Sequence, residues 1–511
     1  MRASCPLAPS AILSEWWPQS RIVLATGLAL FGLALVIYYS QPQRPAPTAP
    51  IESIAVLPFK PLVAESRDPV LELGLADTLI TRLSRLRHVI VRPTSAVRQY
   101  TDLEQDPLAA GRELKVEAVL EGSLQRVGDR LRVTVRLLNV RDGSPLWAYQ
   151  CDEQQCTDLF AVQDSISEEV AQALRLTLSG EEKERLIKRY TENTEAYQLY
   201  LKGRYFWNKY TAEGFKKAIE YFQQAIEKDP SYALAYAGLA DAYIQLGVDV
   251  HSPPKEVMPK AKRAAVKALE LDEALAEAHL SLGTYRLFYD WNWLEAEREL
   301  KRAIELNPNN PDAHHFYGHY LQAMGRTDEA IVETKRGLEL DPVSLIINTE
   351  LGWAFYWARQ YDQAIEQYRK TLKMDPSFVF ASWGLAQAYV ENEMYDEAIA
   401  ELEKARTLSG GWSALLAELG YASAMSGQRV EAQRILHELK ERTRQEYIDP
   451  ALIANIYIAL GEKEQAFEWL EKAYRGRSPV WMIWLKVEPK FDRLRSDLRF
   501  TDLIRRIGLA P

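Results

Sequence analysis

The sequence contains little cysteine and no excess of positive charge. Three Cys residues among 511 are too few to build a scaffold held together by disulfides. The 62 Lys and Arg residues are outnumbered by 71 Asp and Glu, so the net charge of −9 lacks the attraction to phosphate that supports non-specific nucleic-acid binding. Only 25 Gly and 25 Pro are present, which excludes collagen-like and low-complexity chains. We therefore expect a folded protein with no direct nucleic-acid partner.

The chain does contain enough apolar and aromatic side chain to fold. An apolar fraction of 47% is typical of folded protein, and 511 residues predict two to four domains at about 100 to 200 residues each. The 13 Trp and 26 Tyr exceed what core filling usually requires. Because Trp and Tyr dominate many binding interfaces, this surplus predicts an aromatic recognition surface.

One segment near the amino end is apolar without interruption. After a short tail at 1–21, residues 22–39 read IVLATGLALFGLALVIYY and contain no charge. A helix of 18 residues spans roughly 27 Å, close to the thickness of a bilayer core. The sequence therefore predicts one transmembrane helix, followed by a semi-rigid Pro/Ala linker at 40–50. The rival interpretation is a cleaved signal peptide.

Small residues within this segment bear on the oligomeric state. Ala25, Ala29 and Gly32 fall on one face of the predicted helix. Small side chains let two membrane helices approach closely. The pattern is compatible with a homodimer formed through the membrane helix.

Residues 51–180 alternate between strand-like and helical patterns. Strand-like runs at 53–59 and 89–91 each precede a helical pattern. Three β-rich runs separated by hairpin signals occupy 116–150, and an amphipathic helix follows at 157–178. The order β-α-β-α-β-β-β-α predicts an α/β sandwich-like module.

Four short motifs in this module carry a family resemblance. They are SIAVLPF at 53–59, GLADTLI at 74–80, AVLEG at 118–122, and Asp158-Leu-Phe160 together with Gln163 and Asp164. The module resembles the TolB N-terminal-like, or FlgO-like, domain of bacterial envelope proteins, which also occurs in the periplasmic half of membrane-anchored regulators of the CadC type. Together with the predicted membrane helix, the resemblance implies a bacterial inner-membrane protein with a single membrane pass and residues 51–511 in the periplasm. The positive-inside rule weakly favours the corresponding cytoplasmic N-terminus, because Arg2 and Arg21 precede the helix and Arg44 and Lys60 follow it.

The remainder of the chain repeats with a fixed period. Pro308, Pro342 and Pro376 stand 34 residues apart, each at the end of a similar phrase. A period of that length, with small residues at matching positions, is the tetratricopeptide repeat (TPR) pattern of stacked helix pairs. About eight repeats fill 195–480, and 481–511 resembles the C-terminal cap of such proteins. The predicted fold class is therefore an α/β module followed by an α-helical TPR solenoid, with one N-terminal transmembrane helix.

The TPR resemblance also implies a binding groove. Repeat positions 2, 5, 9 and 12 face the concave side in such proteins, and the middle of that side is aromatic here. The candidate partner-binding groove comprises His315, His319, Trp353, Tyr356, Phe380, Trp383 and Gln387. The alternative is that Trp353 and Trp383 pack between neighbouring repeats. The Lys and Asn that clamp a terminal carboxylate in chaperone-binding TPRs are missing from positions 5 and 9, so a chaperone-tail ligand is not expected.

The sequence offers no clear constellation for catalysis or metal binding. Asp77 and Asp164 are single carboxylates, more typical of helix caps or turns than of general bases. His315 and His319 have the i, i+4 spacing of metal ligands, and His314 precedes them, but no Cys and no zinc-protease Glu accompanies them. We therefore expect no catalytic residue, no metal and no cofactor, and we do not expect an enzyme.

Two cysteines follow the last predicted strand. Cys151 and Cys156 are separated by four residues, so a disulfide between them would close a six-residue loop in an oxidising compartment. Two free thiols are the alternative, and the sequence does not decide between them.

Two functions are compatible with this organisation. The first is a membrane-anchored interaction scaffold that binds a protein or peptide partner in the TPR groove. The alternative is the signal-input component of a CadC-like transcriptional system. Regulators of that type carry a winged helix before the membrane segment, whereas only 21 residues precede Ile22 here, so the DNA-binding output is expected on another chain or missing from this one.

Overall fold

The computed structural model describes residues 51–509, except for 62–66, 102–103, 128–129, 152–158, 175, 177 and 249–251. The predicted tail, transmembrane helix and linker, all within 1–50, lie outside the described residues. Within the described part, no helix has both the length and the apolar character that a bilayer crossing needs. This finding overturns the predicted localisation as a single-pass inner-membrane protein with a periplasmic 51–511. The apolar helices of the described part bury their surface against other helices instead.

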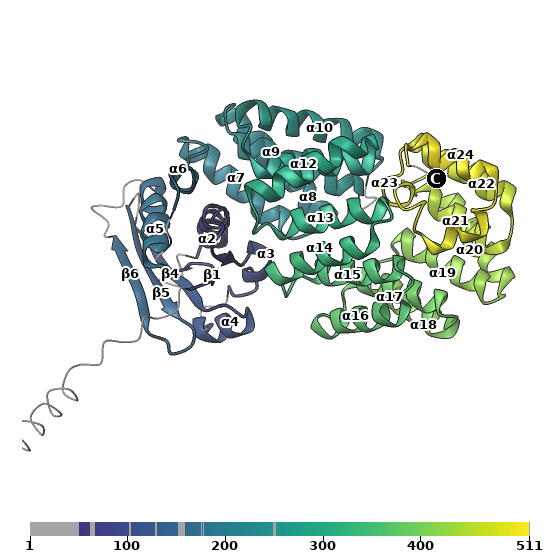
Figure 1. Ribbon diagram of the computed structural model, residues 1–511, viewed down its shortest axis with the longest axis horizontal. Helices are drawn as coiled ribbons and strands as arrows, with labels where there is room; N and C mark the ends of the chain where they lie inside the picture. Colours follow the sequence, from purple (N-terminus) through teal and green to yellow (C-terminus); the bar gives the residue numbers. More distant parts are fainter. Residues whose placement is uncertain are drawn as a thin grey trace, which may run out of the picture. The chain divides into compact units, whose positions relative to one another are not determined.

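Six strands form one mixed sheet at the start of the described chain (Figure 1). They are β1 Ser53–Val56, β2 Lys60–Pro61, β3 Ile90–Val91, β4 Ala118–Val127, β5 Arg130–Asn139 and β6 Pro145–Cys151. The order is β3-β1-β4-β5-β6, with β2 also paired to β4. Strand β1 is parallel to both of its neighbours, whereas β4, β5 and β6 run antiparallel. Because β1 is buried in the middle of the parallel part, its residues Ile54, Ala55 and Val56 are all apolar.

Helices cover this sheet and complete a layered α/β module. They are α2 Pro69–Leu83, α3 Thr94–Val97, α4 Pro107–Glu113, α5 Leu159–Ala173 and α6 Gly180–Ile187. Helix α2 begins at Asp68, whose carboxylate accepts from the backbone N–H groups of Val70 and Leu71. Leu79 of α2 and Ile166 of α5 are buried in the same core as the strands. The predicted strands and helices of this module are present, and the structure adds the short strand β2 and the short helices α3 and α6.

Eight helix pairs follow, stacked in chain order as in a TPR solenoid (Figure 1). They are α7 Thr194–Trp207 with α8 Ala212–Lys228, α9 Ala233–Val248 with α10 Pro254–Leu271, α11 Ala276–Tyr285 with α12 Trp293–Leu306, α13 Pro311–Ala323 with α14 Thr327–Leu340, α15 Leu345–Trp357 with α16 Tyr361–Met374, α17 Val379–Glu391 with α18 Tyr395–Leu408, α19 Ser413–Met425 with α20 Arg429–Arg442, and α21 Pro450–Leu460 with α22 Lys463–Gly476. A π-helical turn, Arg286–Asp290, extends α11.

Glycine lets the helices of neighbouring repeats approach one another. Tyr368 of α16 is fully buried, and its ring lies between Gly352 of α15 and Gly384 of α17. A Cβ atom at either glycine would lie less than 3.0 Å from the ring. The small residues that recur with the repeat period therefore make room for an aromatic side chain of the neighbouring helix.

The C-terminal region has two parts. Helix α24, Leu498–Arg506, packs on the outside of α22, where Arg506 pairs with Glu471 at 2.7 Å. Before it, residues 478–491 include the short helix α23, Pro479–Met482, and the start of a 3-10 helix, Pro489–Leu494. Trp481, Trp484 and Lys490 of this stretch are buried. We call residues 478–491 the returning segment, because it packs against helices more than a hundred residues earlier in the chain.

Candidate binding site in the repeat interior

Six of the seven predicted groove residues line one cavity of about 100 Å³. They are His315, His319, Trp353, Phe380, Trp383 and Gln387, on helices α13, α15 and α17. The seventh, Tyr356, does not line it, because its side chain is fully buried and its hydroxyl donates to Glu488 at 2.8 Å. The structure thus brings most of the predicted residues together, and their binding of a partner stays a prediction.

The cavity wall is a continuous aromatic surface. The ring of Trp383 packs edge-on against Trp353 at 5.7 Å and against Trp412 at 5.2 Å between ring centroids. The indole N–H of Trp353 donates to Gln387 at 3.1 Å. Trp353 and Trp383 therefore pack across neighbouring repeats and face the cavity at the same time. Trp412 was not predicted from the sequence, because its repeat has Gly410 where the regular repeats have Pro308, Pro342 and Pro376.

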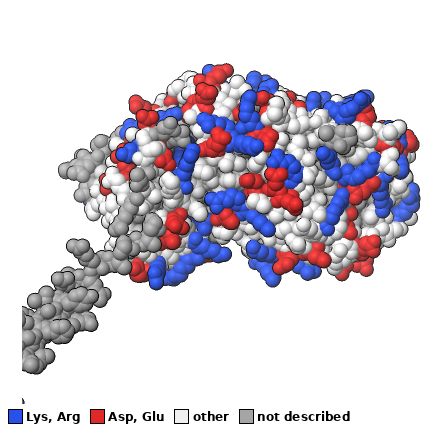
Figure 2. All heavy atoms as spheres, in the orientation of Figure 1, with Lys and Arg blue, Asp and Glu red and all other residues white. Residues whose placement is uncertain are grey.

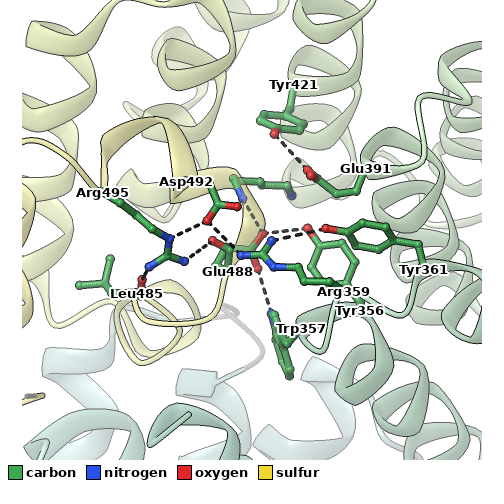
Figure 3. Close-up of polar contacts among 11 residues, drawn as sticks. Tyr356, Trp357, Arg359, Tyr361, Glu391, Tyr421, Leu485, Glu488, Asp492 and Arg495 are labelled. Atoms are coloured by element: carbon green, nitrogen blue, oxygen red, sulfur yellow. Dashed lines mark hydrogen bonds and ion pairs between the residues drawn. The ribbon is translucent and has the colours of Figure 1, made fainter. Parts of the chain in front are cut away.

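The returning segment supplies the opposite wall. The ring of Trp484 stacks on Trp357 with 4.1 Å between centroids, and Trp481 also lines the cavity. Glu488 accepts from the hydroxyl of Tyr356 at 2.8 Å and from the indole N–H of Trp357 at 3.0 Å (Figure 3). The chain therefore fills part of its own concave side. The sequence predicted residues 481–511 only as a terminal cap and did not predict this contact.

Charged and acidic residues border the contact between the returning segment and the inner helices. Asp492 accepts from Arg359 at 2.9 Å and from Arg495 at 2.6 Å (Figure 3). Glu391 accepts from the hydroxyl of Tyr421 at 3.3 Å. Burial and the nearby charge of Glu488 raise the pKa of Glu391 to about 7. A proton on this carboxyl reduces the repulsion between the two acidic groups near neutral pH.

A second and larger hollow lies between the α/β module and the repeats. We call it the chamber; its volume is about 870 Å³, and it is lined by residues of α2, α3 and of the inner helices α7, α9, α11, α13 and α15. Six residues border both the chamber and the aromatic cavity: Tyr210, Gln245, His315, Phe316, Ile346 and Phe380. The two hollows are therefore adjacent, and Phe380 stands at their shared wall.

Hydrogen bonds hold the module against the repeats at the rim of the chamber. The amide of Asn309 donates to the carbonyl oxygens of Ser84, Leu86 and Val89, each at 2.9 Å. The guanidinium of Arg92 donates to the carbonyl of Leu340, also at 2.9 Å. The Asn309 bonds cross from the repeats to the loop between α2 and β3, and the Arg92 bond crosses from the residue after β3 to the end of α14. The two domains therefore form one wall rather than two separate surfaces.

The chamber is acidic. Its lining contains seven Asp or Glu residues and three Lys or Arg residues. Burial, followed by the charge of Asp312, raises the pKa of Asp241 to about 7, while Arg204 opposes this shift. Burial also raises the pKa of Asp341 to about 6 although Ser95 donates to it. On the surface that Figure 2 displays, by contrast, basic and acidic side chains are interspersed.

The two carboxylates singled out from the sequence are held in ion pairs. Asp77 accepts from the hydroxyl of Thr94 at 2.5 Å and pairs with Arg204 at 3.3 Å. Asp164 pairs with Arg82 at 2.6 Å and with Arg189 at 2.7 Å. Both carboxylates therefore have structural partners that connect helices.

The predicted disulfide falls partly outside the described residues. Cys151 ends strand β6 and is disulfide-bonded. Cys156 lies in the stretch 152–158, which the structure does not describe. The pairing of these two cysteines stays a prediction.

Two of the interior histidines converge with a carboxylate. His319 Nε2 lies 3.1 Å from His315 Nε2 and 2.7 Å from Glu350 Oε2. His315 Nε2 lies 3.6 Å from Glu350 Oε1. Among the described residues this is the group whose donor atoms are arranged to hold a metal ion. Glu350 was missed from the sequence, because it lies 31 residues after His319 on the next inner helix.

Comparisons with known proteins identify both domains. Residues 51–169 match the family described as HilA/YgeH-like transcriptional regulator, second domain. Tetratricopeptide repeat families match residues 206–247, 299–332, 349–411 and 451–475. The module is therefore similar to the HilA/YgeH-like second domain. The TolB and FlgO likeness named from the motifs is not shown by these matches, and neither is membrane anchoring.

Curated relatives share about half of their length with this chain. The transcriptional regulator HilA of Salmonella typhimurium is 23% identical over 292 residues, which is 56% of this chain and 50% of that protein. A putative adenylate cyclase 3 of Rhizobium meliloti is 29% identical over 262 residues, 51% of this chain and 44% of that protein. Among solved structures, PilF of Pseudomonas aeruginosa has 21% identity and a TM-score of 0.32, covering 44% of this chain and 96% of its own. The repeat fold points to a non-catalytic protein that binds other proteins, although one relative carries the name of a cyclase.

Proposed function

We propose that this chain is the partner-receiving part of a regulatory protein and that the chamber accepts a segment of a protein or peptide. The observation that carries this proposal is the chamber of about 870 Å³, walled on one side by the HilA/YgeH-like module and on the other by the inner TPR helices. Its volume falls in the range of about 300 to 1,000 Å³ typical of ligand sites. Both domains contribute to one cavity, so an occupant contacts both.

The chemistry of the two hollows describes the occupant. The chamber has an excess of carboxylates, which favours a basic side chain such as Lys or Arg. The aromatic cavity beside it favours an apolar or aromatic side chain. An extended peptide with a basic residue next to an apolar one would place one side chain in each hollow, with Phe380 between them. The predicted groove residues His315, His319, Trp353, Trp383 and Gln387 are part of this proposal.

Site-specific photo-crosslinking tests this proposal in cells that express the full chain. A crosslinking amino acid at Phe380 is expected to capture a discrete partner. The same amino acid at Val430, which is 83% exposed on helix α20, is the control and is expected to capture none. Loss of the Phe380 adduct in the double variant Asp241→Asn, Asp312→Asn would support recognition of a basic segment. Equal adducts at Phe380 and Val430, or none at Phe380, would contradict the proposal.

The aromatic half has its own test. The double variant Trp353→Ala, Trp383→Ala is expected to reduce the Phe380 adduct several-fold, because it removes two large aromatic side chains from the apolar wall of the cavity. Circular dichroism of the variant checks that the repeats remain folded. An unchanged adduct would remove the aromatic cavity from the proposed site and leave the chamber alone.

A second candidate function is signal input to a separate output activity. It is favoured by one observation: about half of this chain is similar to part of a protein named as a transcriptional regulator, and about half to part of one named as a putative adenylate cyclase. A chain that resembles parts of proteins with two different named activities is suited to controlling an output rather than performing it. Hydrogen exchange tests this candidate. Occupancy of the chamber by the crosslinked partner should slow exchange at Ile90 and Val91, because β3 adjoins the Asn309 contacts, and unchanged exchange there would count against it.

A further inference from the structure

The interior histidines of this protein fall into two classes that differ in the use of their ring nitrogens. His279 approaches Glu299 through Nδ1 at 2.6 Å and the carbonyl of Glu273 through Nε2 at 2.8 Å. His314 repeats this pattern one repeat later, with Glu333 at 2.8 Å and the carbonyl of Pro308 at 3.2 Å. Each of these histidines has an acceptor at both nitrogens, so its role is to join the helices of its repeat.

His315 and His319 behave differently. Their Nε2 atoms face each other at 3.1 Å and both face the carboxylate of Glu350. The Nδ1 atoms of both rings are buried and have no hydrogen-bond partner among the described residues. All the polar contacts of these two side chains are therefore made through Nε2, at a single point.

Hydrogen bonding alone does not satisfy this arrangement. If His319 Nε2 carries a proton and donates it to Glu350, the same N–H does not also point at His315, so His315 Nε2 faces no donor. If His315 Nε2 carries a proton as well, two N–H groups face each other at 3.1 Å. A positive ion between the three groups would instead accept a lone pair from each of them.

The charge of the site also favours a cation. The side chains of Glu350 and His315 are buried, with only 9% and 5% of each residue exposed. Among the described residues that line the adjoining cavity there is no Lys or Arg. The site therefore combines a buried carboxylate with two imidazole Nε2 atoms, beside a cavity whose described lining has no cationic side chain.

We propose that His315, His319 and Glu350 hold a divalent transition-metal ion of the Zn²⁺ class, with a further coordination position open to the aromatic cavity. A tetrahedral Zn²⁺ with ligands at about 2.0 to 2.2 Å separates neighbouring donor atoms by about 3.3 to 3.5 Å. Here the two Nε2 atoms are 3.1 Å apart, Glu350 Oε2 lies 2.7 Å from His319 Nε2, and the other oxygen, Oε1, lies 3.6 Å from His315 Nε2. The shortest of these separations must therefore open by about 0.6 Å to admit the ion. Two His and one carboxylate are also the donor set of zinc sites that keep a position open.

Aromatic packing replaces hydrogen bonding in orienting the two rings. The ring of His315 stacks on Phe316 at 4.6 Å between centroids. Trp484 of the returning segment packs edge-on against His319 at 5.2 Å. This apolar shell limits the access of solvent to the ligands and lowers the local dielectric. It also makes a tryptophan a close reporter of what His319 binds.

Metal titration of the full chain, untagged and stripped with a chelator, tests the proposal. Zn²⁺ in competition with a chromophoric chelator is expected to bind with a stoichiometry of one per chain. His319→Ala and Glu350→Gln are each expected to weaken this binding by about 100-fold or more, which is beyond the effect of removing a residue that only orients a ligand. His314→Gln and the exposed His437→Ala are the matched controls and should keep it. A wild-type chain that binds less than one Zn²⁺, or a His319→Ala variant that binds as the wild type does, would overturn the proposal.

A spectroscopic measurement tests the proposal even if one of these variants folds poorly. Co²⁺ bound by the wild-type chain should give the intense visible absorption of a site with four or five ligands and should quench tryptophan fluorescence. Trp484→Phe should reduce the quenching and retain the Co²⁺ absorption, because Trp484 contacts His319 but is no ligand. A weak, six-coordinate Co²⁺ spectrum, or quenching that Trp484→Phe leaves unchanged, would contradict a site at these residues.

Discussion

The ammonium group of Lys490 lies 2.6 Å from the carboxylate of Glu418, and the two side chains are only 0% and 2% exposed. Glu418 stands on the inner helix α19, so this ion pair joins the returning segment to the concave wall. The same carboxylate accepts from the indole N–H of Trp383 at 3.3 Å and from the amide of Gln387 at 3.1 Å. Two predicted groove residues are therefore fixed in place by a contact that begins in the C-terminal region.

Removing one partner of this pair should destabilise the protein strongly. Lys490→Met keeps most of the side-chain length but leaves the carboxylate of Glu418 buried without its cation, which typically costs about 3 to 5 kcal/mol. We expect a lower urea midpoint, monitored by tryptophan fluorescence, because the aromatic cavity is next to the lost contact.

A double variant and a surface variant provide the controls for this prediction. Glu418→Gln in the Lys490→Met background removes the uncompensated charge and should restore most of the stability. Lys472→Met disrupts an exposed pair with Glu468, whose side chains are 47% and 63% exposed, and should change stability by less than about 1 kcal/mol. If Lys490→Met behaves like Lys472→Met, the returning segment is not held by this ion pair.

Adding a methyl group at Gly352 should disturb the stack of repeats. A Cβ at this position would lie less than 3.0 Å from the ring of Tyr368, which is also confined by Gly384 on its other side. Overpacking of this kind costs about 1 to 3 kcal/mol, so Gly352→Ala should lower the melting temperature.

The double variant Gly352→Ala, Tyr368→Leu frees space beside the new methyl group and should recover part of that loss. Gly476→Ala is the control, since nothing lies within 4 Å of its would-be Cβ. Gly476→Ala should be neutral or slightly stabilising in calorimetry. A Gly352→Ala variant as stable as Gly476→Ala would refute the close approach.

The repeat period predicted more of the cavity-lining residues than local sequence patterns did. Positions counted from Pro308, Pro342 and Pro376 place His315, Trp353 and five further residues on inner helices, and six of the seven line one cavity. This works because every TPR pair presents the same helix face inward. Tyr356 follows the same rule, but its hydroxyl is bonded to Glu488. The sequence did not predict this contact, because nothing periodic in it indicates that residues 478–491 fold back.

Contacts between domains were the second feature that the sequence did not reveal. Asn309 looks like a turn residue after a repeat helix, and Arg92 like the end of a strand. In the structure, Asn309 bonds to carbonyls more than two hundred residues away, which creates the chamber wall. Such pairings depend on how two domains pack together, and no local spacing encodes that. The contact between Glu350 and His319 lies between these two cases. The two residues are 31 positions apart, close to the 34-residue period, so the repeat pattern itself places them on neighbouring inner helices.

The pH dependence of stability should change when the acid group of Asp241 is removed. The pKa of Asp241 is raised to about 7 by burial and by Asp312 of α13, while Arg204 of α7 opposes the shift and Gln245 of α9 is its hydrogen-bond partner. An acid with a raised pKa favours the folded state below its ordinary pKa of 3.8, and this contribution is lost as pH rises through about 7. Asp241→Asn avoids that loss.

We therefore expect Asp241→Asn to melt with the wild type at pH 4 and to melt higher, by about 2 °C or more, at pH 8. The exposed Glu366→Gln on α16 is the control and should leave the difference between the two pH values unchanged. Melting curves at a series of pH values measure the effect. A variant that is less stable than the wild type at pH 8 would show that the charged form of Asp241 is stabilised in the chamber.

Replacing Asn309 should loosen the α/β module from the repeats without unfolding either. Its side-chain amide is the donor to three carbonyl oxygens of the loop between α2 and β3, and the residue is 5% exposed. Asn309→Ala leaves these buried acceptors without a donor, at a cost of about 1 to 2 kcal/mol. Hydrogen exchange of residues 84–91 should then accelerate by about 5- to 30-fold, while exchange in α17 to α22 stays the same.

Asn309→Asp should accelerate the exchange of residues 84–91 further, because a carboxylate would face three carbonyl oxygens. The exposed Asn392→Ala is the control and should have no effect on these residues. Uniform acceleration along the whole chain in Asn309→Ala would mean that module and repeats unfold together rather than separate at the chamber.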